Sequence, residues 1–503
     1  MSIEIDPSYE EPDVDGLDIA PDNGWDALYA DGEWVSAGDR DAIEVENPAT
    51  RATLTTVPSA TEDDVDEAYA VAADAQEEWA ERPPQERAAV VTRVGDLIDE
   101  YAGDLATLFA VECGGVGLKA GFETELAQNT IEVGGSLAMR RTGNIKESVT
   151  PGKENMVVRE PAGVVGVITP WNFPLYLTSR VVAPAIALGN SVVLKPDENT
   201  PITGGLALAA LFEEAGLPPG VLNVVPGYGH EIGDHFSGHP VPSVMSFTGS
   251  SEVGRRVGQR AVGQFTDPAL ELGGNNAHIV LSDADLERAV DAGAFGSFTH
   301  QGQECISINR HLVHESLYDD YVAALADRAE GLPIGDPREE GALVGPVINE
   351  SQRDKIVRFV EESVERGATV EAGGDHEGLF IEPTVLSGMT NDMPAACNEH
   401  FGPVAPVIPF ESDEEAVRIA NDTEYGLSGS VQSTDVARAR DVADGMETGM
   451  VHINDQSLND EPHVAFGGVG ASGIGRYNDE QILDTLTTLK LISIQREPRE
   501  YPY

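Results

Sequence analysis

Val164-Val165-Gly166-Val167-Ile168 is an uninterrupted apolar run, and a short run of this kind is typical of a strand buried on both faces of a sheet. Similar runs follow, with segments of helical spacing between them, at 190–194, 221–225 and 243–247. This alternation predicts a parallel sheet with crossover helices. A second series begins at 277–281 and continues to about residue 455. The sequence therefore predicts an α/β protein with two parallel-sheet domains, which meet near residues 271–276.

The chain of 503 residues is strongly acidic, with 87 Asp and Glu against 31 Lys and Arg and a formal net charge of −56. Lysine is nearly absent and occurs only at positions 119, 146, 153, 195, 355 and 490. Self-repulsion on this scale destabilises a compact fold in dilute buffer, and salt screens it. We therefore predict a halophilic protein that works in a high-salt cytoplasm. So negative a body disfavours nucleic acid and anionic membranes as partners.

The cysteine pattern and the apolar pattern both indicate an intracellular protein. Cys113, Cys305 and Cys397 show no paired spacing, so neither a disulfide framework nor a zinc knuckle is predicted. The N-terminus, Met-Ser-Ile-Glu-Ile-Asp-Pro, lacks the basic and apolar regions of a signal peptide. No apolar run approaches the length of a membrane span. We expect a soluble cytoplasmic protein.

Local patterns predict several individual elements. Asp31-Gly32 lies between two short apolar segments and predicts a hairpin. Thr61-Glu62-Asp63-Asp64 predicts a capping box at the start of a helix. Apolar spacing predicts one amphipathic helix near 86–112, and another at 204–215 that stops at Gly216.

The stretch His300-Gln301-Gly302-Gln303-Glu304-Cys305 contains a candidate nucleophile, and Glu271 begins a Glu-Leu-Gly-Gly-Asn run 34 residues upstream. A thiol can form a covalent acyl intermediate, and a carboxylate can activate the water that releases it. Glu271 also lies at the predicted domain junction, where ligand clefts form preferentially. Taken singly, however, Cys305 is better explained as a small buried hydrophobe, and Glu271 as a surface charge.

No G-x-G-x-x-G fingerprint follows a strand, but another turn suits a nucleotide. The run that ends at Phe247 leads into Thr248-Gly249-Ser250-Ser251-Glu252-Val253-Gly254, and backbone N–H groups at such a helix start can hold a pyrophosphate. One strand earlier, Lys195 and Glu198 follow an apolar run and could clamp ribose hydroxyls. Glu198 would also repel a 2′-phosphate, which favours NAD over NADP. Because any strand-to-helix turn looks similar, the turn alone does not establish a nucleotide site.

Asn172 lies in Thr169-Pro170-Trp171-Asn172-Phe173-Pro174, just after the first apolar run. An asparagine amide can donate a hydrogen bond to a developing oxyanion, and the flanking prolines would fix the loop. An asparagine here can equally satisfy the backbone groups of a turn. Both interpretations remain open on this motif alone.

Taken together, these motifs resemble those of the aldehyde dehydrogenase superfamily over nearly the whole chain, from Asn47-Pro48-Ala49-Thr50 to Phe466-Gly467-Gly468-Val469-Gly470-Ala471-Ser472-Gly473. The resemblance implies that Cys305 is the nucleophile, Glu271 the general base and Asn172 part of the oxyanion hole. It implies oxidation of an aldehyde to the carboxylic acid through a thiohemiacetal and a thioester, without CoA. It also implies NAD as the cofactor, bound by Trp171, Lys195, Glu198, Gly249, Ser250, Gly254, Glu399 and Phe401.

The same resemblance implies the domain limits and an oligomer. Residues 1–136 and 160–272 would form a Rossmann-like NAD-binding domain, residues 273–480 the catalytic domain, and residues 137–159 with 481–503 a small β oligomerisation arm. Near the end of the chain, Leu491-Ile492-Ser493-Ile494 predicts a short strand, which would be an exposed edge unless another subunit covers it. We expect a homodimer or a homotetramer.

Two further features concern the substrate and the thiol. His300-Gln301-Gly302-Gln303 and Asn454-Asp455-Gln456 resemble the branch that acts on benzaldehyde- or vanillin-like substrates. Glu304 stands where the family usually has an apolar or basic residue, and its charge would disfavour the thiolate unless its side chain points away. Two alternatives are a CoA-acylating semialdehyde dehydrogenase, against which the presence of Glu271 argues, and a non-catalytic binding or structural protein on the same fold.

His235 and His239 have the spacing of two metal ligands on one helical face. Gly238 and Pro240 break the helix which that spacing needs. No metal site is therefore predicted.

Overall fold

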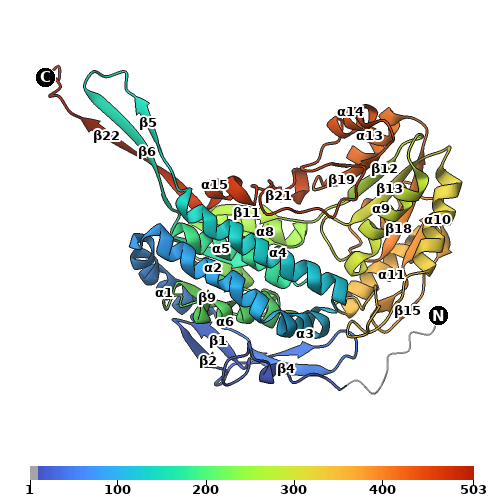
Figure 1. Ribbon diagram of the computed structural model, residues 1–503, viewed down its shortest axis with the longest axis horizontal. Helices are drawn as coiled ribbons and strands as arrows, with labels where there is room; N and C mark the ends of the chain where they lie inside the picture. Colours follow the sequence, from blue (N-terminus) through green and yellow to red (C-terminus); the bar gives the residue numbers. More distant parts are fainter. Residues whose placement is uncertain (1–9) are drawn as a thin grey trace.

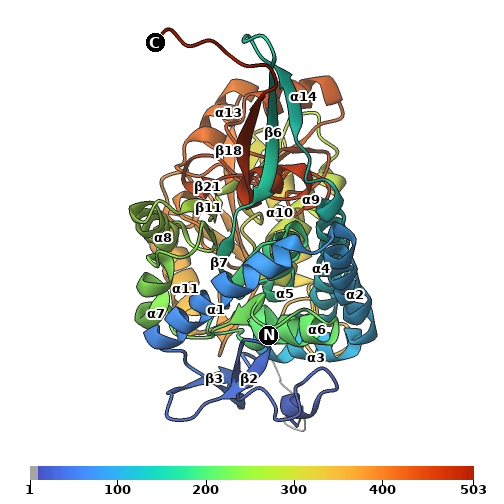
Figure 2. The same ribbon diagram turned by 90° about the vertical axis from the view of Figure 1, so that its left-hand side faces the viewer.

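The computed structural model describes residues 10–503, and in it the chain builds two large sheets, each with helices packed against it (Figure 1). A thin three-stranded arm projects from the body beside the first sheet (Figure 2). The prediction of an α/β fold with two parallel-sheet domains is confirmed. The predicted domain limits stay predictions. The first seven residues, which gave no sign of a signal peptide, lie outside the described residues.

The first sheet has eight strands: β1 (Ala27–Ala30), β2 (Glu33–Ser36), β7 (Val164–Ile168), β8 (Ser191–Lys195), β9 (Leu222–Val224), β10 (Val244–Thr248), β11 (Asp267–Glu271) and β21 (Gly473–Ile474). Their order is β2-β1-β9-β8-β7-β10-β11-β21. The five central strands, β7 to β11, are parallel, as the apolar runs predicted. The outer strands β1 and β2 form the hairpin predicted at Asp31-Gly32. The carboxyl ends of the five parallel strands consequently meet at one edge.

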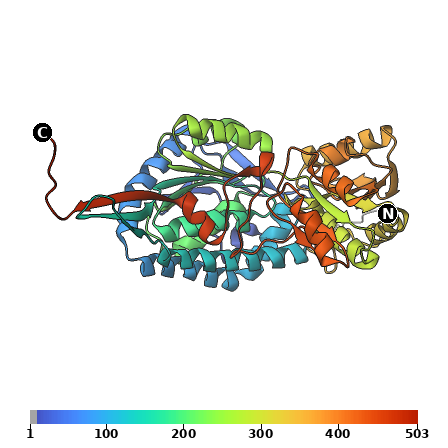
Figure 3. The same ribbon diagram turned by 90° about the horizontal axis from the view of Figure 1, so that it is seen from above.

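Helices cover both faces of this sheet (Figure 3). One face carries α1 (Glu62–Glu81), α7 (Gly229–Ser237) and α8 (Ser251–Gly263). The other carries α2 (Pro84–Glu100), α3 (Ala102–Cys113), α4 (Gly117–Ser136), α5 (Pro174–Leu188) and α6 (Ala207–Glu214), with the short turns η1 (Val14–Gly16), η2 (Leu137–Met139) and η3 (Ile202–Leu206). Side chains of β8 alternate between the two cores, because Val192 and Leu194 face the α5 layer while Val193 faces α1.

Most of the predicted helical features are confirmed, with one correction. The Thr61 capping box opens α1, with reciprocal hydrogen bonds between Thr61 and Asp64. The helix predicted at 204–215 is η3 followed by α6, and it ends before Gly216, whose φ is +80°. The single helix predicted near 86–112 is wrong, because the chain forms α2 and α3 with a break at Tyr101 (φ −99°, ψ 17°). There the Tyr101 hydroxyl donates to Glu214 of α6, and the following turn redirects α3.

The second sheet has seven strands: β12 (Asn276–Val280), β13 (Ile308–His314), β14 (Thr369–Ala372), β17 (Thr384–Ser387), β18 (Val404–Phe410), β19 (Gly429–Gln432) and β20 (His452–Ile453). Their order is β14-β17-β18-β13-β12-β19-β20, and only the β14–β17 pairing is antiparallel. Its helices are α9 (Leu286–Phe298), α10 (Tyr318–Glu330), α11 (Glu350–Glu365), α12 (Pro394–Cys397), α13 (Asp413–Asn421) and α14 (Val436–Asp444). Only four residues, Leu272 to Asn275, separate β11 of the first sheet from β12 of the second.

Smaller elements complete the chain. The hairpins β3 (Ala42–Glu46) with β4 (Thr53–Pro58) and β15 (His376–Glu377) with β16 (Phe380–Ile381) lie outside the large sheets. Three short turns remain: η4 (Thr299–Gly302) before the Cys305 loop, η5 (Gly470–Ser472) before β21, and η6 (Asp479–Gln481) before α15 (Ile482–Leu486). The helix α15 leads into the last strand.

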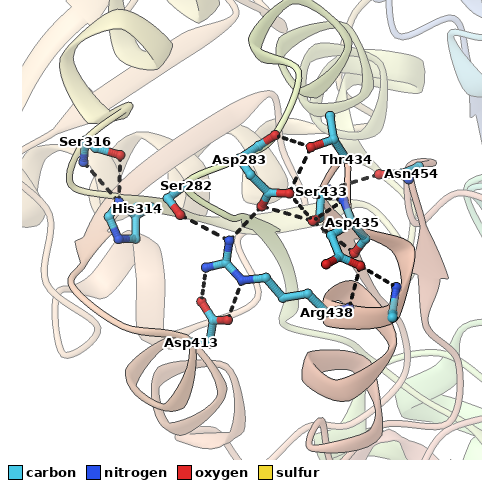
Figure 4. Close-up of polar contacts among 11 residues, drawn as sticks. Ser282, Asp283, His314, Ser316, Asp413, Ser433, Thr434, Asp435, Arg438 and Asn454 are labelled. Carbon is cyan, nitrogen blue, oxygen red and sulfur yellow. Dashed lines mark hydrogen bonds and ion pairs between the residues drawn. The ribbon is translucent and has the colours of Figure 1, made fainter.

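A polar cluster joins the loops that follow β12 and β19 (Figure 4). The Asp283 carboxylate accepts hydrogen bonds from the Ser433 and Thr434 hydroxyls and from the backbone N–H of Asp435. Arg438 of α14 bridges Asp283 and Asp413. Although burial acts against the charged form, these donors lower the pKa of Asp283 to about 2. The cluster therefore connects the loops after β12 and β19 with the helices α13 and α14.

The arm consists of β5 (Asn144–Glu147), β6 (Lys153–Pro161) and β22 (Thr487–Gln495), in the order β22-β6-β5. The strand predicted at 491–494 is confirmed, but it is longer than predicted, because β22 has nine residues and pairs along the whole of β6. The apolar pattern identified only its middle, since polar residues flank it. Leu489, Leu491 and Ile492 are exposed on this arm. Among residues 10–503, no helix combines the length and the hydropathy of a membrane span.

Candidate active site

The loop that carries Cys305 follows η4 and has an unusual backbone. His300 and Gln301 have positive φ angles of 46° and 56°, and Gly302 follows with 67°. A side chain at Gly302 would collide with the carbonyl of Gly402, so glycine is required there. Non-glycine residues in this region cost free energy and persist only where the surroundings hold them. The chain is thus turned sharply just before the thiol.

The linker between the two sheets holds this loop from behind. Asn276, the first residue of β12, donates from its side-chain amide to the carbonyl oxygens of Cys305 (2.9 Å) and Ser307 (2.7 Å). A Cβ atom at Gly274 would overlap the Cys305 carbonyl oxygen, so the linker approaches the loop as closely as glycine allows. The glycines of the Glu-Leu-Gly-Gly-Asn run thereby explain how Cys305 is positioned.

Cys305 opens onto a cavity of about 360 Å³ that lies between the two sheets. Aromatic and aliphatic side chains dominate its wall: Phe122, Leu126, Phe173, Tyr176, Leu177, Phe295, Ile306, Leu458 and Phe466. Phe122 of α4 and Phe295 of α9 meet edge to face, with ring centroids 6.4 Å apart, and both are partly exposed. An apolar pocket with few polar groups and a reactive residue at its wall is the usual form of a small-molecule site.

Asn172 lies in the same cavity, on the loop between β7 and α5. Its side-chain amide donates to the Gln303 carbonyl at 2.9 Å, which aims the amide at the Cys305 loop. The buried carboxylate of Glu123 fixes the next turn, because it accepts the backbone N–H groups of Leu175 (2.8 Å) and Tyr176 (3.2 Å). Asn172 is therefore held against the loop that carries Cys305, and its role as an oxyanion donor stays a prediction.

Glu271 is the last residue of β11 and is 3% exposed. Among the described residues, neither of its carboxylate oxygens has a hydrogen-bond partner. Burial raises the pKa of Glu271 to about 8, although Arg180 and Arg476 act to lower it. Its carboxylate lies beside Gly467 and does not line the cavity with Cys305. The structure thus brings Asn172 and Cys305 into one cavity, with Glu271 next to that cavity.

The acidic neighbour of the thiol, Glu304, is buried and lines the cavity. Burial raises its pKa to about 8, so the carboxyl is largely protonated at neutral pH. Glu304 lines the same cavity as Cys305. Because its carboxyl is neutral when protonated, it does not oppose the negative charge of a Cys305 thiolate. Burial raises the pKa of Cys305 above its ordinary value, and the Arg180 guanidinium acts in the opposite direction.

The predicted nucleotide residues of the first sheet lie along its carboxyl edge. Lys195 ends β8, is 3% exposed, and places its ammonium 3.7 Å from the Glu198 carboxylate. Gly249 and Ser250 follow β10, and the Ser250 hydroxyl caps α8 by accepting the Val253 N–H. At the start of α8, Ser250, Glu252 and Val253 are exposed, whereas Ser251 and Gly254 are buried.

Two glycines near this edge are required by close packing against other side chains. A Cβ atom at Gly254 would overlap Leu272, and one at Gly273 would overlap the Glu399 carboxylate. Glu399 accepts a hydrogen bond from the Gly274 N–H at 2.9 Å. Phe401 has a φ of 55° and meets Trp171 edge to face at 5.5 Å. The contacts of Glu399 with Gly274 and of Phe401 with Trp171 join the two sheets at this edge, where the predicted dinucleotide would bind.

The sequence did not single out several residues of the cavity, among them Arg180, Tyr176 and Asp460. Arg180 of α5 is 3% exposed, and it contacts Asp460 and the ring of Tyr176. An arginine within the otherwise apolar stretch 174–188 is the one signal that could have marked this position. Nothing near Asp460 in the sequence indicates that it would meet Arg180, because the two are 280 residues apart.

The histidine pair outside this site is closer than the sequence suggested. α7 ends at Ser237, as the breaking residues predicted, yet His235 and His239 both contact Asp66, at 2.6 Å and 3.2 Å. The ring nitrogen Nδ1 of His239 accepts the Val241 N–H, so its Nε2 carries the proton and donates to Asp66. That tautomer is wrong for a metal ligand, and the absence of a metal stays a prediction.

Comparison with known proteins identifies the family. The two parallel sheets, with a thiol at the wall of the cavity between them, are the architecture of an α/β protein with a small-molecule site. The model of the aldehyde dehydrogenase family matches residues 34–492. The chain belongs to the aldehyde dehydrogenase family, as predicted, and it is an oxidoreductase that acts on aldehydes.

Similar relatives include a benzaldehyde dehydrogenase of Bacillus subtilis, 47% identical over 475 residues, which cover 94% of this chain and 98% of the relative. A vanillin dehydrogenase of Corynebacterium glutamicum is 46% identical, with 92% of this chain and 96% of the relative covered. A benzaldehyde dehydrogenase [NAD(+)] of Pseudomonas putida is 42% identical, over 95% and 98%. The predicted resemblance to the benzaldehyde and vanillin branch is confirmed.

The fold is also similar to that of solved structures. Betaine aldehyde dehydrogenase of Staphylococcus aureus, in complex with NAD+, superposes with a TM-score of 0.93 and is 35% identical. The match covers 95% of this chain and 96% of the other.

Proposed function

We propose that this enzyme oxidises an uncharged aromatic aldehyde to its carboxylic acid, with Cys305 as the nucleophile. The observation that carries the proposal is the apolar, aromatic-lined cavity at whose wall Cys305 and Asn172 lie together. The benzaldehyde and vanillin dehydrogenases among its relatives support an aromatic substrate. A flat, apolar substrate buries its ring against such walls without leaving polar groups unpaired.

The cofactor of this enzyme is NAD. NAD, when bound, takes the hydride from the aldehyde carbon. We assign Lys195 and Glu198 to the adenosine ribose, and the turn formed by Gly249, Ser250 and Gly254 to the pyrophosphate. We assign Glu399 to the nicotinamide ribose, and Phe401 with Trp171 to the side of the ring. The negative charge of Glu198 disfavours a 2′-phosphate.

The first half of the reaction acylates Cys305. Its thiolate forms a bond to the aldehyde carbon, and the carbonyl oxygen becomes an oxyanion. The side-chain amide of Asn172 and the backbone N–H of Cys305 donate hydrogen bonds to this oxygen. When the carbon–oxygen double bond forms again, the carbon loses its hydride and a thioester remains on Cys305. Arg180 favours the thiolate on which this sequence depends.

The second half releases the acid. Glu271 removes a proton from water, the water oxygen attacks the thioester carbon, and the carbon–sulfur bond breaks. The raised pKa of Glu271 suits a base that works near neutral pH. Because its carboxylate lies beside Gly467 in this structure, it acts after a rotation towards Cys305 or through an intervening water.

The Glu271→Gln variant tests this division of roles. We expect the pre-steady-state burst of NADH to persist, while steady-state turnover falls by about 10²-fold or more because hydrolysis loses its base. Rapid mixing with benzaldehyde separates the two rates. Equal loss of burst and turnover would count against Glu271 as the base of hydrolysis.

The two alternative functions find no support among the relatives. Product analysis separates a CoA-acylating reaction, because an acyl-CoA would form only when CoA is added. A non-catalytic protein would produce no NADH from any aldehyde.

The assembly that we propose is a homodimer or homotetramer formed through the arm. Strand β22 is an edge strand with exposed Leu489, Leu491 and Ile492, and such an edge is normally covered. Replacing all three residues by Ser or Thr should reduce the mass measured by light scattering to that of a smaller species.

The acidic surface supports our proposal of a halophilic cytoplasmic enzyme. Because salt screens self-repulsion, melting temperature and activity should rise between about 0.1 M and about 2 M salt. Full activity and an unchanged melting temperature in dilute buffer would argue against halophily.

A further inference from the structure

Arg180 is a buried cation in the wall of the substrate cavity. It is the only charged residue of α5, and its side chain is 2% exposed. Aromatic rings enclose the guanidinium, with centroids at 4.2 Å for Phe466, 5.2 Å for Tyr176 and 5.7 Å for Tyr477. Burial acts to lower its pKa, but Tyr176 and Asp460 raise it overall, so Arg180 remains charged.

Asp460 compensates this charge. One of its oxygens, Oδ2, lies 2.9 Å from the Arg180 guanidinium and also accepts the Tyr176 hydroxyl. The other, Oδ1, accepts a hydrogen bond from the Asn478 amide at 2.8 Å. Its side chain is only 7% exposed. Both carboxylate oxygens are therefore committed, which makes Asp460 a fixed counter-ion.

The remaining ionisable groups of the cavity are acidic or neutral. Glu125 and Glu304 line it together with Asp460, and Arg180 is the only cationic side chain among the described lining residues. An aldehyde that also carried a carboxylate would lose the hydration of that carboxylate in this cavity. It would find no cation there that is free to pair with it.

We propose that Asp460 is a specificity-determining residue, which neutralises Arg180 and so excludes aldehydes that carry a carboxylate. This inference rests on the proposed function, since it assumes that the cavity receives the aldehyde. With Asp460 in place, the cavity accepts neutral aromatic aldehydes. Without its charge, Arg180 becomes a buried cation that pairs with a carboxylate on the substrate.

The test compares benzaldehyde with 3-formylbenzoate and 4-formylbenzoate at constant ionic strength. In the wild-type enzyme, kcat/KM for both formylbenzoates should be at least about 100-fold below that for benzaldehyde. The Asp460→Asn variant should raise the ratio of formylbenzoate to benzaldehyde for at least one isomer by about 10-fold or more, mainly through KM. Asn removes the charge and keeps one acceptor oxygen, which can retain the hydrogen bond from Tyr176 or the one from Asn478.

Two controls separate pairing from a general loss of negative charge. Glu125→Gln removes one charge from the same cavity without freeing Arg180, and its substrate ratio should stay within about 3-fold of the wild-type ratio. The double variant Arg180→Met with Asp460→Leu has neither charge and should lack the gain. Because breaking a buried pair is costly, Asp460→Ser provides a second single variant if the Asn variant does not fold.

The outcomes distinguish this inference from the proposed function. A wild-type enzyme that oxidises formylbenzoates as well as benzaldehyde overturns the inference without any variant. A wild-type preference for benzaldehyde with no gain in folded Asp460 variants, or the same gain in Glu125→Gln, also overturns it and leaves the proposed function intact. Failure of the wild-type enzyme to oxidise any aromatic aldehyde would instead refute the proposed function.

Discussion

Two thiols of this protein, the buried Cys113 and the partly buried Cys305, both lie near a cation but differ in their surroundings. Cys113 ends α3, is fully enclosed, donates to the Phe109 carbonyl and lies 3.1 Å from the Lys119 ammonium. Burial raises its pKa to about 11 even so. Cys305 has no lysine so near, yet it opens onto a cavity beside a fixed amide donor. A neighbouring cation is therefore insufficient to identify a nucleophile; access and a place for the oxyanion are what distinguish the two.

The largest expected effect comes from replacing each of the two thiols in turn. Cys305→Ser should lower kcat by at least about 10⁴-fold, because the hydroxyl is a far poorer nucleophile. Cys113→Ser should keep most of the activity and lose about 1–2 kcal/mol of stability, since a smaller and more strongly hydrated group is buried in place of the thiol. NADH formation and chemical denaturation measure the two. Comparable loss of activity in both variants, with folding intact, would remove the distinction.

The next effect concerns the donor that only Cys305 has. Asn172→Ala should lower kcat by about 10²- to 10³-fold, as expected for loss of one oxyanion donor. The rate at which iodoacetamide modifies Cys305, followed by peptide mass spectrometry, should change far less, because alkylation develops no oxyanion. A parallel fall in both rates would mean that Asn172 orders the loop and does not stabilise the transition state.

The smallest effect concerns Glu304, the carboxyl beside Cys305. Its folded-state pKa of about 8 lies above the ordinary value of 4.5, so the folded protein retains a proton that the unfolded chain releases. The wild-type free energy of unfolding is therefore lowered as pH rises from about 4.5 to about 8. Glu304→Gln has no such proton and should be increasingly more stable than wild type over that range.

Denaturation of both proteins at pH values across this window measures the difference. A constant difference between about pH 5 and pH 9 would contradict a protonated Glu304. Activity of Glu304→Gln near pH 7 should stay within about 3-fold of wild type, since the amide resembles the neutral acid.

The sequence allowed prediction of whatever local pattern determines. Apolar runs located β7 and β8, and strand ends placed Asn172 and Lys195 at the edge where they are found. The family was also predicted from its motifs and is confirmed. These features depend on neighbouring residues, which is why a linear reading of the chain reaches them.

Features that depend on distant residues were out of reach. The Arg180–Asp460 pair, the meeting of His239 with Asp66 and the length of β22 each require knowledge of which segments fold together. The protonation of Glu304 is of the same kind, because it follows from how completely its surroundings exclude water. Charge state in this site is a property of packing.

The short connection between β11 and β12 links the two sheets and also positions the loop that carries Cys305. Glu271 ends the strand on one side, the Asn276 amide donates to the carbonyl of Cys305, and the Gly274 N–H donates to the Glu399 carboxylate. A hinge between the halves of this enzyme would have to bend here and in the segment between β20 and β21, where the chain returns to the first sheet. Bending at this connection would shift Asn276 and with it the Cys305 carbonyl that accepts its hydrogen bond. A change in the angle between the two sheets would therefore also move the thiol.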